Sequence, residues 1–249
     1  MTPHRVFIVG HEGTTGLRIH ERLSDRKDIE LLATADEDRK NVEAIKVVAK
    51  KADLVFLCLP DVASKEIMAA IGDFPCKVID TSTAFRTTAG WAYGFPELGE
   101  SYKTDIATKK HIANPGCHAS GMIACIAPLV KAGLVPADYP FTITSLTGYS
   151  GGGKKMIDQY ESSPKDYFLY APRQYGLGQE HKHLPEVQHV CGLSEAPIFM
   201  PIVDDYYSGM EVTVGIHSRL CHKPVCIDKV QQTLEYFYKD STIVTVAPF

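Results

Sequence analysis

The chain has 249 residues, of which 45% are hydrophobic and 22% charged, and its formal net charge is −4. This composition is that of a globular protein with one large or two modest cores. The slightly acidic balance gives no basic field for a nucleic acid, and no apolar run approaches the ~18–20 residues of a membrane span. We therefore expect neither a nucleic acid nor a membrane partner. The N-terminus lacks the features of a signal peptide, so we expect a cytoplasmic protein.

Seven cysteines are present, and no two of them have the C-x-x-C spacing. A disulfide framework is not expected in a chain of this length without a secretory signal, and the spacing excludes a zinc site built from close cysteine pairs. Most of these sulfurs are expected to be small buried apolar groups. No bound metal is expected.

The N-terminal segment predicts a dinucleotide-binding loop. The run "RVFIVG" is typical of a buried strand, and it leads into "GHEGTTG" and then a helical stretch. In this arrangement, backbone N–H groups hold the pyrophosphate of a cofactor. The spacing G-x-x-G-x-x-G is not the commoner form, so a tight turn without a ligand is the alternative. The expected cofactor contacts are Gly10, Gly13, Thr14, Thr15 and Gly16.

The residues after the second predicted strand (29–35) bear on the choice of cofactor. An acidic residue there, Asp36, would hold a ribose hydroxyl, as in NAD-preferring proteins. Arg39 and Lys40 would instead meet a 2′-phosphate. We favour NADP(H), and a solvated charged turn is the alternative.

Strands that alternate with helical stretches predict a doubly wound parallel sheet in the N-terminal part. The loop "DTSTAFR" follows one of these strands, and loops in such positions line the ligand crevice. We expect Ser82 to contact the cofactor and Arg86 to bind an anionic substrate group, since a guanidinium suits a carboxylate or a phosphate. A surface arginine is the alternative.

The stretch "NPGCHASGMI" predicts a nucleophile at a helix start. Pro115 and Gly116 form a tight turn, and apolar residues recur at helical spacing after Cys117. The free N–H groups of a helix N-terminus stabilise a thiolate, which is the nucleophilic form of cysteine. A buried structural cysteine is the alternative. We expect Cys117 to be catalytic.

The segment "HKHLPE" supplies the acid–base candidates His181 and His183. On an extended backbone the two imidazoles face one side. Pro185 suits the first turn of a helix, which places His183 next to a helix N-terminus. We favour His183 as the acid–base and His181 as a substrate or phosphate contact. A zinc hydrolase that uses the two histidines is an alternative. The remaining histidines that we singled out are expected to be structural or exposed: His11, His118, His189 and His217.

A third glycine cluster, "GYSGGGKK", follows a predicted strand. Its backbone N–H groups, at Ser150, Gly151 and Gly152, are expected to hold a substrate anion. A flexible loop without a ligand is the alternative. Asn114 and Glu186 are also expected to contact the substrate.

Taken in order, "GHEGTTG", "DTSTAFR", "ANPGCHASG", "GYSGGGKKMI" and "HKHLPE" resemble the N-acetyl-γ-glutamyl-phosphate reductase family, in its shorter form, over essentially the whole chain. The resemblance implies an α/β protein with a Rossmann-like NADP-binding domain, placed at residues 1–116. It also implies an α+β catalytic domain at 117–249, with a mainly antiparallel sheet of the semialdehyde dehydrogenase type. That sheet would support contacts in a homodimer or homotetramer.

The resemblance further implies NADPH-dependent reduction of N-acetyl-L-glutamyl 5-phosphate to the 5-semialdehyde and phosphate, in arginine biosynthesis. Cys117 would form a thioester, and the histidines of "HKHLPE" would move the proton. The family continues beyond the last strand of this chain, so a C-terminally truncated fragment is expected. The alternatives are a reductase for a related free or carrier-bound acyl phosphate, such as an aspartyl or aminoadipyl phosphate, and a cofactor-binding module without catalysis.

Overall fold

The computed structural model describes residues 2–248. The described chain divides into two compact units, one formed by residues 2–94 and 101–115 and the other by residues 95–100 and 116–248. Each unit has its own β-sheet. The domain ranges 1–116 and 117–249 stay a prediction.

Within the described residues, the first unit contains a six-stranded sheet in the order β2-β1-β3-β4-β6-β5, and every strand pairing in it is parallel. This confirms the predicted parallel sheet. The strands are β1 (His4–Val9), β2 (Ile29–Leu32), β3 (Leu54–Leu57), β4 (Lys77–Asp80), β5 (Ala92–Tyr93) and β6 (His111–Ala113).

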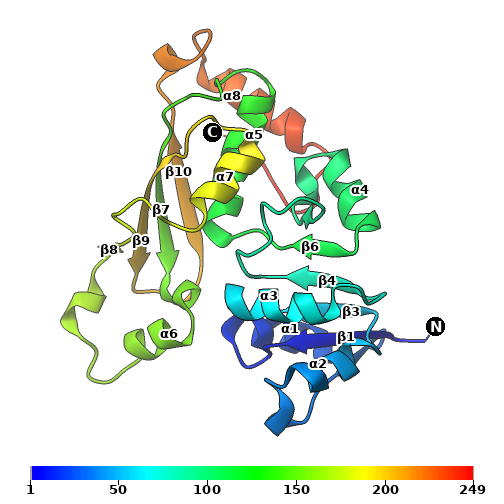
Figure 1. Cartoon of the computed structure of the whole chain (residues 1–249). Coiled ribbons are helices and arrows are strands. Elements are labelled where there is room, and N and C mark those ends of the chain that lie inside the picture. The colour runs from blue at the N-terminus through cyan, green and yellow to red at the C-terminus, as the bar shows by residue number, and fades with distance from the viewer. Residues whose placement is uncertain (1, 249) are drawn as a thin grey trace. The chain divides into compact units, whose positions relative to one another are not determined.

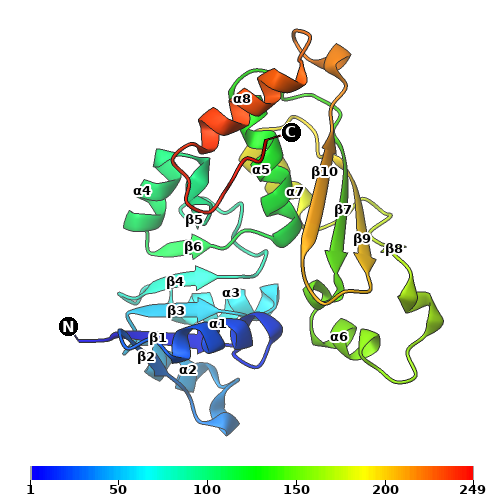
Figure 2. The same cartoon turned by 180° about the vertical axis from the view of Figure 1, so that it is seen from behind.

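The helices of the first unit cover both faces of its sheet. Helices α2 and α3 pack together on one face, and α1 lies on the opposite face (Figures 1 and 2). The chain runs from β1 outward to β2 and then returns to β3 on the other side of β1, so the strand order reverses there. Ligands of open parallel sheets bind at such a reversal, beyond the carboxyl ends of the strands. The helices are α1 (Thr14–Ser24), α2 (Val42–Ala49), α3 (Asp61–Ile71) and α4 (Glu100–Thr108).

The sheet of the second unit is mixed, which corrects the expectation of a mainly antiparallel sheet. Its order is β10-β7-β9-β8; the outer pairings are antiparallel, whereas the long central pair β7–β9 is parallel. A parallel pair needs a long crossover, and helices α6 (Lys154–Tyr160) and α7 (Leu184–Cys191) lie in the chain between these two strands. The strands are β7 (Thr142–Gly148), β8 (Arg173–Gln174), β9 (Ile198–Asp204) and β10 (Met210–Gly215).

Helix α5 is the centre of the second unit, because it packs against α7, α8 and β10. Its Met122, Ile123 and Ile126 are fully buried. In Figure 1, α7 runs beside α5. The helices are α5 (Cys117–Lys131), α6 (Lys154–Tyr160), α7 (Leu184–Cys191) and α8 (Ile227–Tyr238). The short 3₁₀ helices of the chain are η1 (Asp36–Asp38), η2 (Pro96–Leu98), η3 (Tyr149–Gly152), η4 (Tyr167–Tyr170) and η5 (Ser218–Leu220). Among residues 2–248, no helix is both long and apolar enough to cross a membrane.

Gly121 marks the closest approach of α5 to β10. A Cβ atom at this position would lie 2.5 Å from Cγ2 of Val212. Valine is stiff about its χ1 torsion, so the contact cannot be relieved by a simple side-chain movement. The packing of α5 therefore requires glycine here.

We predict that Gly121→Ala lowers the free energy of unfolding by about 1 kcal/mol, because an overpacking cost of about 1–3 kcal/mol outweighs a gain of about 1 kcal/mol in helix propensity. Adding Val212→Ala removes the 2.5 Å contact with Cγ2 and leaves the 3.1 Å contact with Cβ, so Gly121→Ala should destabilise the Val212→Ala protein less than it destabilises the parent. Urea unfolding of the four proteins in this cycle measures both effects. An increase in stability from Gly121→Ala alone would contradict the close packing.

Candidate active site

The loop between β1 and α1 is built from glycines at positions where a side chain has no room. Gly10 has a φ of +85°, and a Cβ there would lie 2.4 Å from the Cys58 carbonyl oxygen. A Cβ on Gly16 would lie 2.3 Å from the Gly10 carbonyl oxygen. Gly13 is the N-cap of α1, and Thr14 and Thr15 are its first residues. The predicted loop residues thus form a tight backbone cradle at a helix N-terminus, which fits a pyrophosphate.

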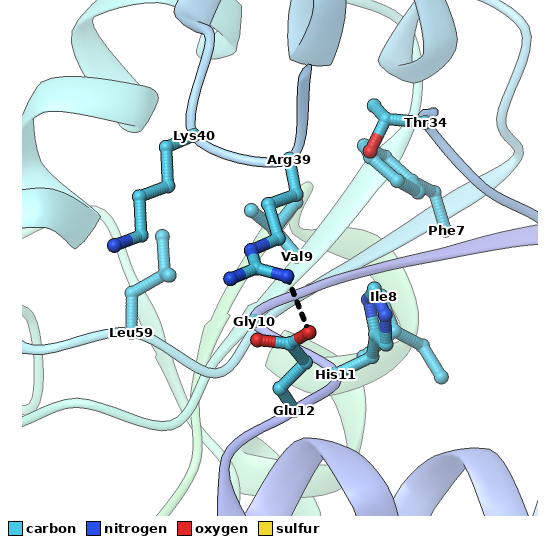
Figure 3. Close-up of a pocket in the computed structure, with 10 residues that line it drawn as sticks. All are labelled: Phe7, Ile8, Val9, Gly10, His11, Glu12, Thr34, Arg39, Lys40 and Leu59. Atoms are coloured by element: carbon cyan, nitrogen blue, oxygen red, sulfur yellow. Dashed lines mark hydrogen bonds and ion pairs between the residues drawn. The ribbon is translucent and has the colours of Figure 1, made fainter. Parts of the chain in front are cut away.

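A pocket of about 110 Å³ adjoins this loop, and both basic residues predicted to read the cofactor line it (Figure 3). Arg39 turns toward the glycine loop, and its Nη1 lies 2.6 Å from Oε1 of Glu12. Lys40 extends beside Leu59. Asp36 is the first residue of η1 and is exposed, and it is not among the residues lining this pocket. Of the residues that the sequence offers for distinguishing NADP from NAD, the pocket thus contains Arg39 and Lys40 but not Asp36.

The loop after β4 is organised around a buried carboxylate. Asp80 is fully buried and accepts hydrogen bonds from the hydroxyls of Ser64 (2.5 Å) and Ser82 (2.6 Å). Burial raises the pKa of Asp80, and the two hydroxyl donors and the Arg86 charge act in the opposite direction. The hydroxyl of Ser82 is thus engaged inside the protein, and its contact with a cofactor stays a prediction.

Arg86 links the loop after β4 to the segment after β6. Its Nε donates to the Asn114 carbonyl (3.0 Å), and its Nη2 donates to the Thr81 carbonyl (3.1 Å). The Asn114 side chain donates to the Pro115 carbonyl (3.1 Å). These bonds hold the strand ends of the first unit together, and the substrate contacts of Arg86 and Asn114 stay predictions.

Cys117 is the first residue of α5, and its side chain is exposed. The preceding Gly116 is the extended N-cap of the helix. The thiol therefore stands at a helix N-terminus, in agreement with the sequence pattern. Cys226 is also exposed and caps α8, so position alone does not distinguish the two thiols. The residues around Cys117 distinguish it from Cys226.

Glu186 joins the starts of two helices. It lies in the first turn of α7 and is 2% exposed, and its Oε1 accepts a hydrogen bond from the backbone N–H of Gly116 (2.8 Å). The residue before Cys117 is thereby fixed to α7. This bond gives the carboxylate a positioning role inside the protein. The contact of Glu186 with a substrate stays a prediction.

Three imidazoles gather at His118, the residue that follows Cys117. The ring centroids of His181 and His183 are 4.8 Å apart, and His118 lies 5.6 and 5.7 Å from them. The His183 backbone N–H donates to Nδ1 of His181 (3.3 Å), so the proton of a neutral His181 sits on Nε2. Burial and the nearby Lys182 lower the pKa of His181. His183 is buried and is the N-cap of α7.

His118 is the residue whose importance the sequence does not reveal. It is 3% exposed, and its ring nitrogens lie 2.8 Å from the hydroxyls of Ser145 and Tyr175. Burial, with a smaller effect of His181, lowers the pKa of His118 to about 4. Ser145 lies on the buried face of β7 together with Ile143. The alternation of buried and less buried residues along this strand is the one sequence signal that could have indicated a buried Ser145. Tyr175 is 57 residues away from His118 and carries no such signal.

The third glycine cluster forms η3, at the end of β7. Ser150 is half-buried and its backbone N–H donates to the Tyr207 carbonyl (2.9 Å), whereas Gly151 and Gly152 are exposed. An anion contact by these three residues stays a prediction. Among residues 2–248, no group of three or more His, Cys, Asp or Glu side chains is arranged to hold a metal ion.

Comparison with known families assigns a domain to each part of the chain. Residues 5–105 match the semialdehyde dehydrogenase NAD binding domain, and residues 117–249 match the semialdehyde dehydrogenase dimerisation domain. Similar solved structures include aspartate semialdehyde dehydrogenase II from Vibrio cholerae, with a TM-score of 0.69 at 18% identity, covering 95% of this chain and 79% of that one. Aspartate semialdehyde dehydrogenase with NADP from Candida albicans has a TM-score of 0.65 at 16% identity, covering 93% and 76%. At these identities the likeness shows the semialdehyde dehydrogenase fold alone.

The sequence relatives are closer. The chain is 44% identical to N-acetyl-gamma-glutamyl-phosphate reductase 2 from Pseudomonas putida, over 98% of this chain and 77% of the relative. It is 46% identical to N-acetyl-gamma-glutamyl-phosphate reductase from a Chelativorans species, over 88% and 70%. It is 37% identical to N-acetyl-gamma-glutamyl-phosphate reductase 2 from a Nostoc species, over 100% and 79%. On this identity and coverage, the chain belongs to the N-acetyl-gamma-glutamyl-phosphate reductase family.

Proposed function

We propose that this protein is an NADPH-dependent N-acetyl-gamma-glutamyl-phosphate reductase that works through a thioester on Cys117. The observation that carries the proposal is the exposed thiol at the start of α5, with Glu186 fixing its turn and with His181 and His183 against the ring of the next residue, His118. The names of its relatives supply the substrate, an acyl phosphate. The product is the corresponding semialdehyde, an intermediate of arginine biosynthesis.

In the first step, the Cys117 thiolate attacks the acyl carbon. The carbon–oxygen bond to the phosphate breaks, phosphate leaves with the electron pair, and a thioester remains. Negative charge develops on the carbonyl oxygen during the attack. The backbone N–H groups in the first turn of α5 would stabilise that charge.

In the second step, the thioester is reduced and the aldehyde is released. NADPH, when bound, supplies a hydride to the acyl carbon. We assign the proton transfers at the resulting thiohemiacetal to His183. His183 donates a proton to the thiohemiacetal oxygen, which becomes a hydroxyl. It then removes this proton as the carbon–sulfur bond breaks and the aldehyde forms. His181 would offer its Nε2–H to a substrate or phosphate oxygen, since its Nδ1 already accepts a bond from His183.

The first unit fits a dinucleotide phosphate. Its cradle at Gly10 and Gly16 admits no Cβ, and Arg39 and Lys40 line the adjoining pocket. We therefore propose NADP(H) as the cofactor. A cytoplasmic location and a homodimer or homotetramer, formed through the dimerisation domain, belong to the same proposal.

For the nucleophile, we expect Cys117→Ala and Cys117→Ser to lower turnover by more than about 10³-fold, because no other group can carry the acyl intermediate. The assay measures NADPH formation from the semialdehyde, phosphate and NADP. The matched control is Cys226→Ala, at the other exposed helix-start thiol, which should keep full activity. In the unmodified protein, iodoacetamide at pH 7 should label the Cys117 peptide faster than the Cys226 peptide. Turnover by Cys117→Ala at more than a small fraction of the parent rate would exclude the thioester.

For the histidines, we expect His183→Asn to lower kcat by about 10²–10⁴-fold and to change its pH profile. His181→Asn should mainly raise KM, because the role proposed for His181 is a substrate or phosphate contact; burial lowers the pKa of His181, which favours the neutral imidazole that makes this contact. His189→Asn, exposed on α7, is the control. If His181→Asn lowered kcat and His183→Asn mainly raised KM, His181 would be the acid–base and His183 the substrate contact.

For the cofactor, we expect Arg39→Ala combined with Lys40→Ala to weaken NADPH binding by about tenfold or more, since charge-assisted bonds to a phosphate are lost. NADH binding should change by less than about twofold, as NADH has no 2′-phosphate. Glu12→Gln should tighten NADPH binding a few-fold, because it releases Arg39 from its ion pair. Titration of both cofactors measures these constants. An equal loss for NADPH and NADH would show that this pocket does not read the 2′-phosphate.

A further inference from the structure

The loop between β8 and α7, residues 175–183, carries both histidines of the proposed site. It starts at the edge of the sheet, where β8 pairs with β9 in antiparallel register. The Tyr175 backbone N–H adds one further bond, to the Pro201 carbonyl (3.0 Å). At Gly176, whose φ is +63°, the chain turns away from β9. The earlier part of β9, which contains Phe199, lies beyond this point.

The side chain of Gln179 takes the place of a neighbouring strand at Phe199. Its Oε1 accepts a hydrogen bond from the Phe199 backbone N–H (2.7 Å), and its Nε2 donates to the Phe199 carbonyl (2.9 Å). Both bonds have normal lengths. The N–H and C=O groups along a sheet edge need partners, and here one side-chain amide supplies both. The loop is thereby tied to β9 a second time.

Gln179 makes these bonds from a strained backbone conformation. Its φ is +57°, and among residues 2–248 it is the only residue other than glycine with a positive φ. Its backbone N–H donates to the Gly176 carbonyl (3.2 Å), which closes the turn. A residue with a Cβ atom rarely adopts this region, and such conformations persist where the surrounding structure holds them, most often at functional sites. The two bonds to Phe199 are what hold this one.

Phe199 connects the Gln179 amide to His181. The rings of His181 and Phe199 pack with their centroids 5.1 Å apart and an interplanar angle of 81°. On its other side, Nδ1 of His181 accepts the His183 backbone N–H, and the His181 carbonyl accepts that of Leu184 (2.9 Å). His181 is thus held between the start of α7 and the residue to which Gln179 ties the loop.

His183 depends less on this tie. It is the N-cap of α7, its carbonyl accepts the Val187 backbone N–H (3.0 Å), and its side chain is 3% exposed. His181 precedes the helix and is half-buried. A change confined to the loop therefore moves His181 more than His183.

We propose that Gln179 is a positioning residue for His181: its side-chain amide pins the loop before α7 to the backbone of Phe199 and so sets the place of the His181 imidazole. The inference rests on the proposed function in taking His181 as a contact of the substrate or its phosphate. Because such a contact acts on binding, the effect of Gln179 falls on KM and not on kcat.

The first test removes the amide and relaxes the backbone. Gln179→Gly adopts a positive φ without strain and deletes both bonds to Phe199. We expect the KM for the semialdehyde or for phosphate to rise about tenfold, because a displaced contact loses its binding geometry. The kcat and its pH profile should stay within about twofold of the parent values, since His183 is held by α7.

Two comparisons separate positioning from a general loss of structure. In a His181→Asn background, Gln179→Gly should change KM by less than about twofold, since the group that it positions is gone. Gln188→Ala is the matched control, because it also removes a bond from a glutamine amide to a backbone carbonyl, that of Ser194 (3.0 Å). This control should leave KM unchanged.

The second test observes His181 without catalysis, by an NMR titration of nitrogen-15-labelled histidines. The titratable groups that face its ring are His118 on α5, Tyr175, Lys182 and His183. All of them remain in Gln179→Gly. Burial lowers the pKa of His181, so a ring that leaves its place should show a pKa closer to the ordinary value. The pKa of His118 should not rise, because hydroxyls of the sheet and the loop hold its ring.

Gln179→Asn decides the matter if Gln179→Gly does not fold. Asparagine tolerates a positive φ, but its amide is one methylene too short for both bonds to Phe199, so the same changes are expected. An unchanged His181 pKa in the folded variants, or a KM increase that persists in full in the His181→Asn background, would overturn the inference. If His181→Asn alone leaves KM unchanged, the role of His181 in the proposed function fails instead, and the titration still decides whether Gln179 positions the ring.

Discussion

The hydrogen bond from the Gly116 backbone to the Glu186 carboxylate is the constraint on which the reactive site depends. A carboxylate that is 2% exposed must receive hydrogen bonds, since a buried charge without them costs several kcal/mol. Here one of its donors is the residue that caps α5. The start of α5, which carries Cys117, is thereby fixed to the start of α7, which carries His183. The helix that carries the thiol and the helix that His183 caps are far apart in sequence, and they meet at this charged contact as well as along their packed faces.

The two units differ in where they place their polar groups. In the first, parallel strands end at a common edge, where the glycine loop and Arg39 border the pocket that we propose for a cofactor phosphate. In the second, buried polar groups are placed inside a helix and sheet core. Asp80 in the first unit and Glu186 in the second both stay buried because neighbouring donors satisfy them, and both fix a loop that carries predicted ligand contacts.

The sequence predicts the first unit well and the second less completely. Local patterns suffice for the strand, glycine loop and helix at Gly10, and for a helix that begins at Cys117, because both depend on residues close together in the chain. The parallel pairing of β7 with β9 depends on strands separated by α6 and α7, so a local pattern does not specify it. His118 illustrates the same limit: Ser145 and Tyr175, whose hydroxyls hold its ring, are 27 and 57 residues away. Glu186 was expected to face a substrate, and only the tertiary structure reveals its bond to Gly116.

The thioester that we propose on Cys117 can be detected directly. The most direct measurement is peptide mapping after the protein is mixed with N-acetyl-L-glutamyl 5-phosphate in the absence of NADPH and quenched in acid. We expect an acyl group on the Cys117 peptide that hydroxylamine removes, and none on the Cys226 peptide. A protein that reduces the acyl phosphate when NADPH is present, but never shows an acylated Cys117, would contradict it.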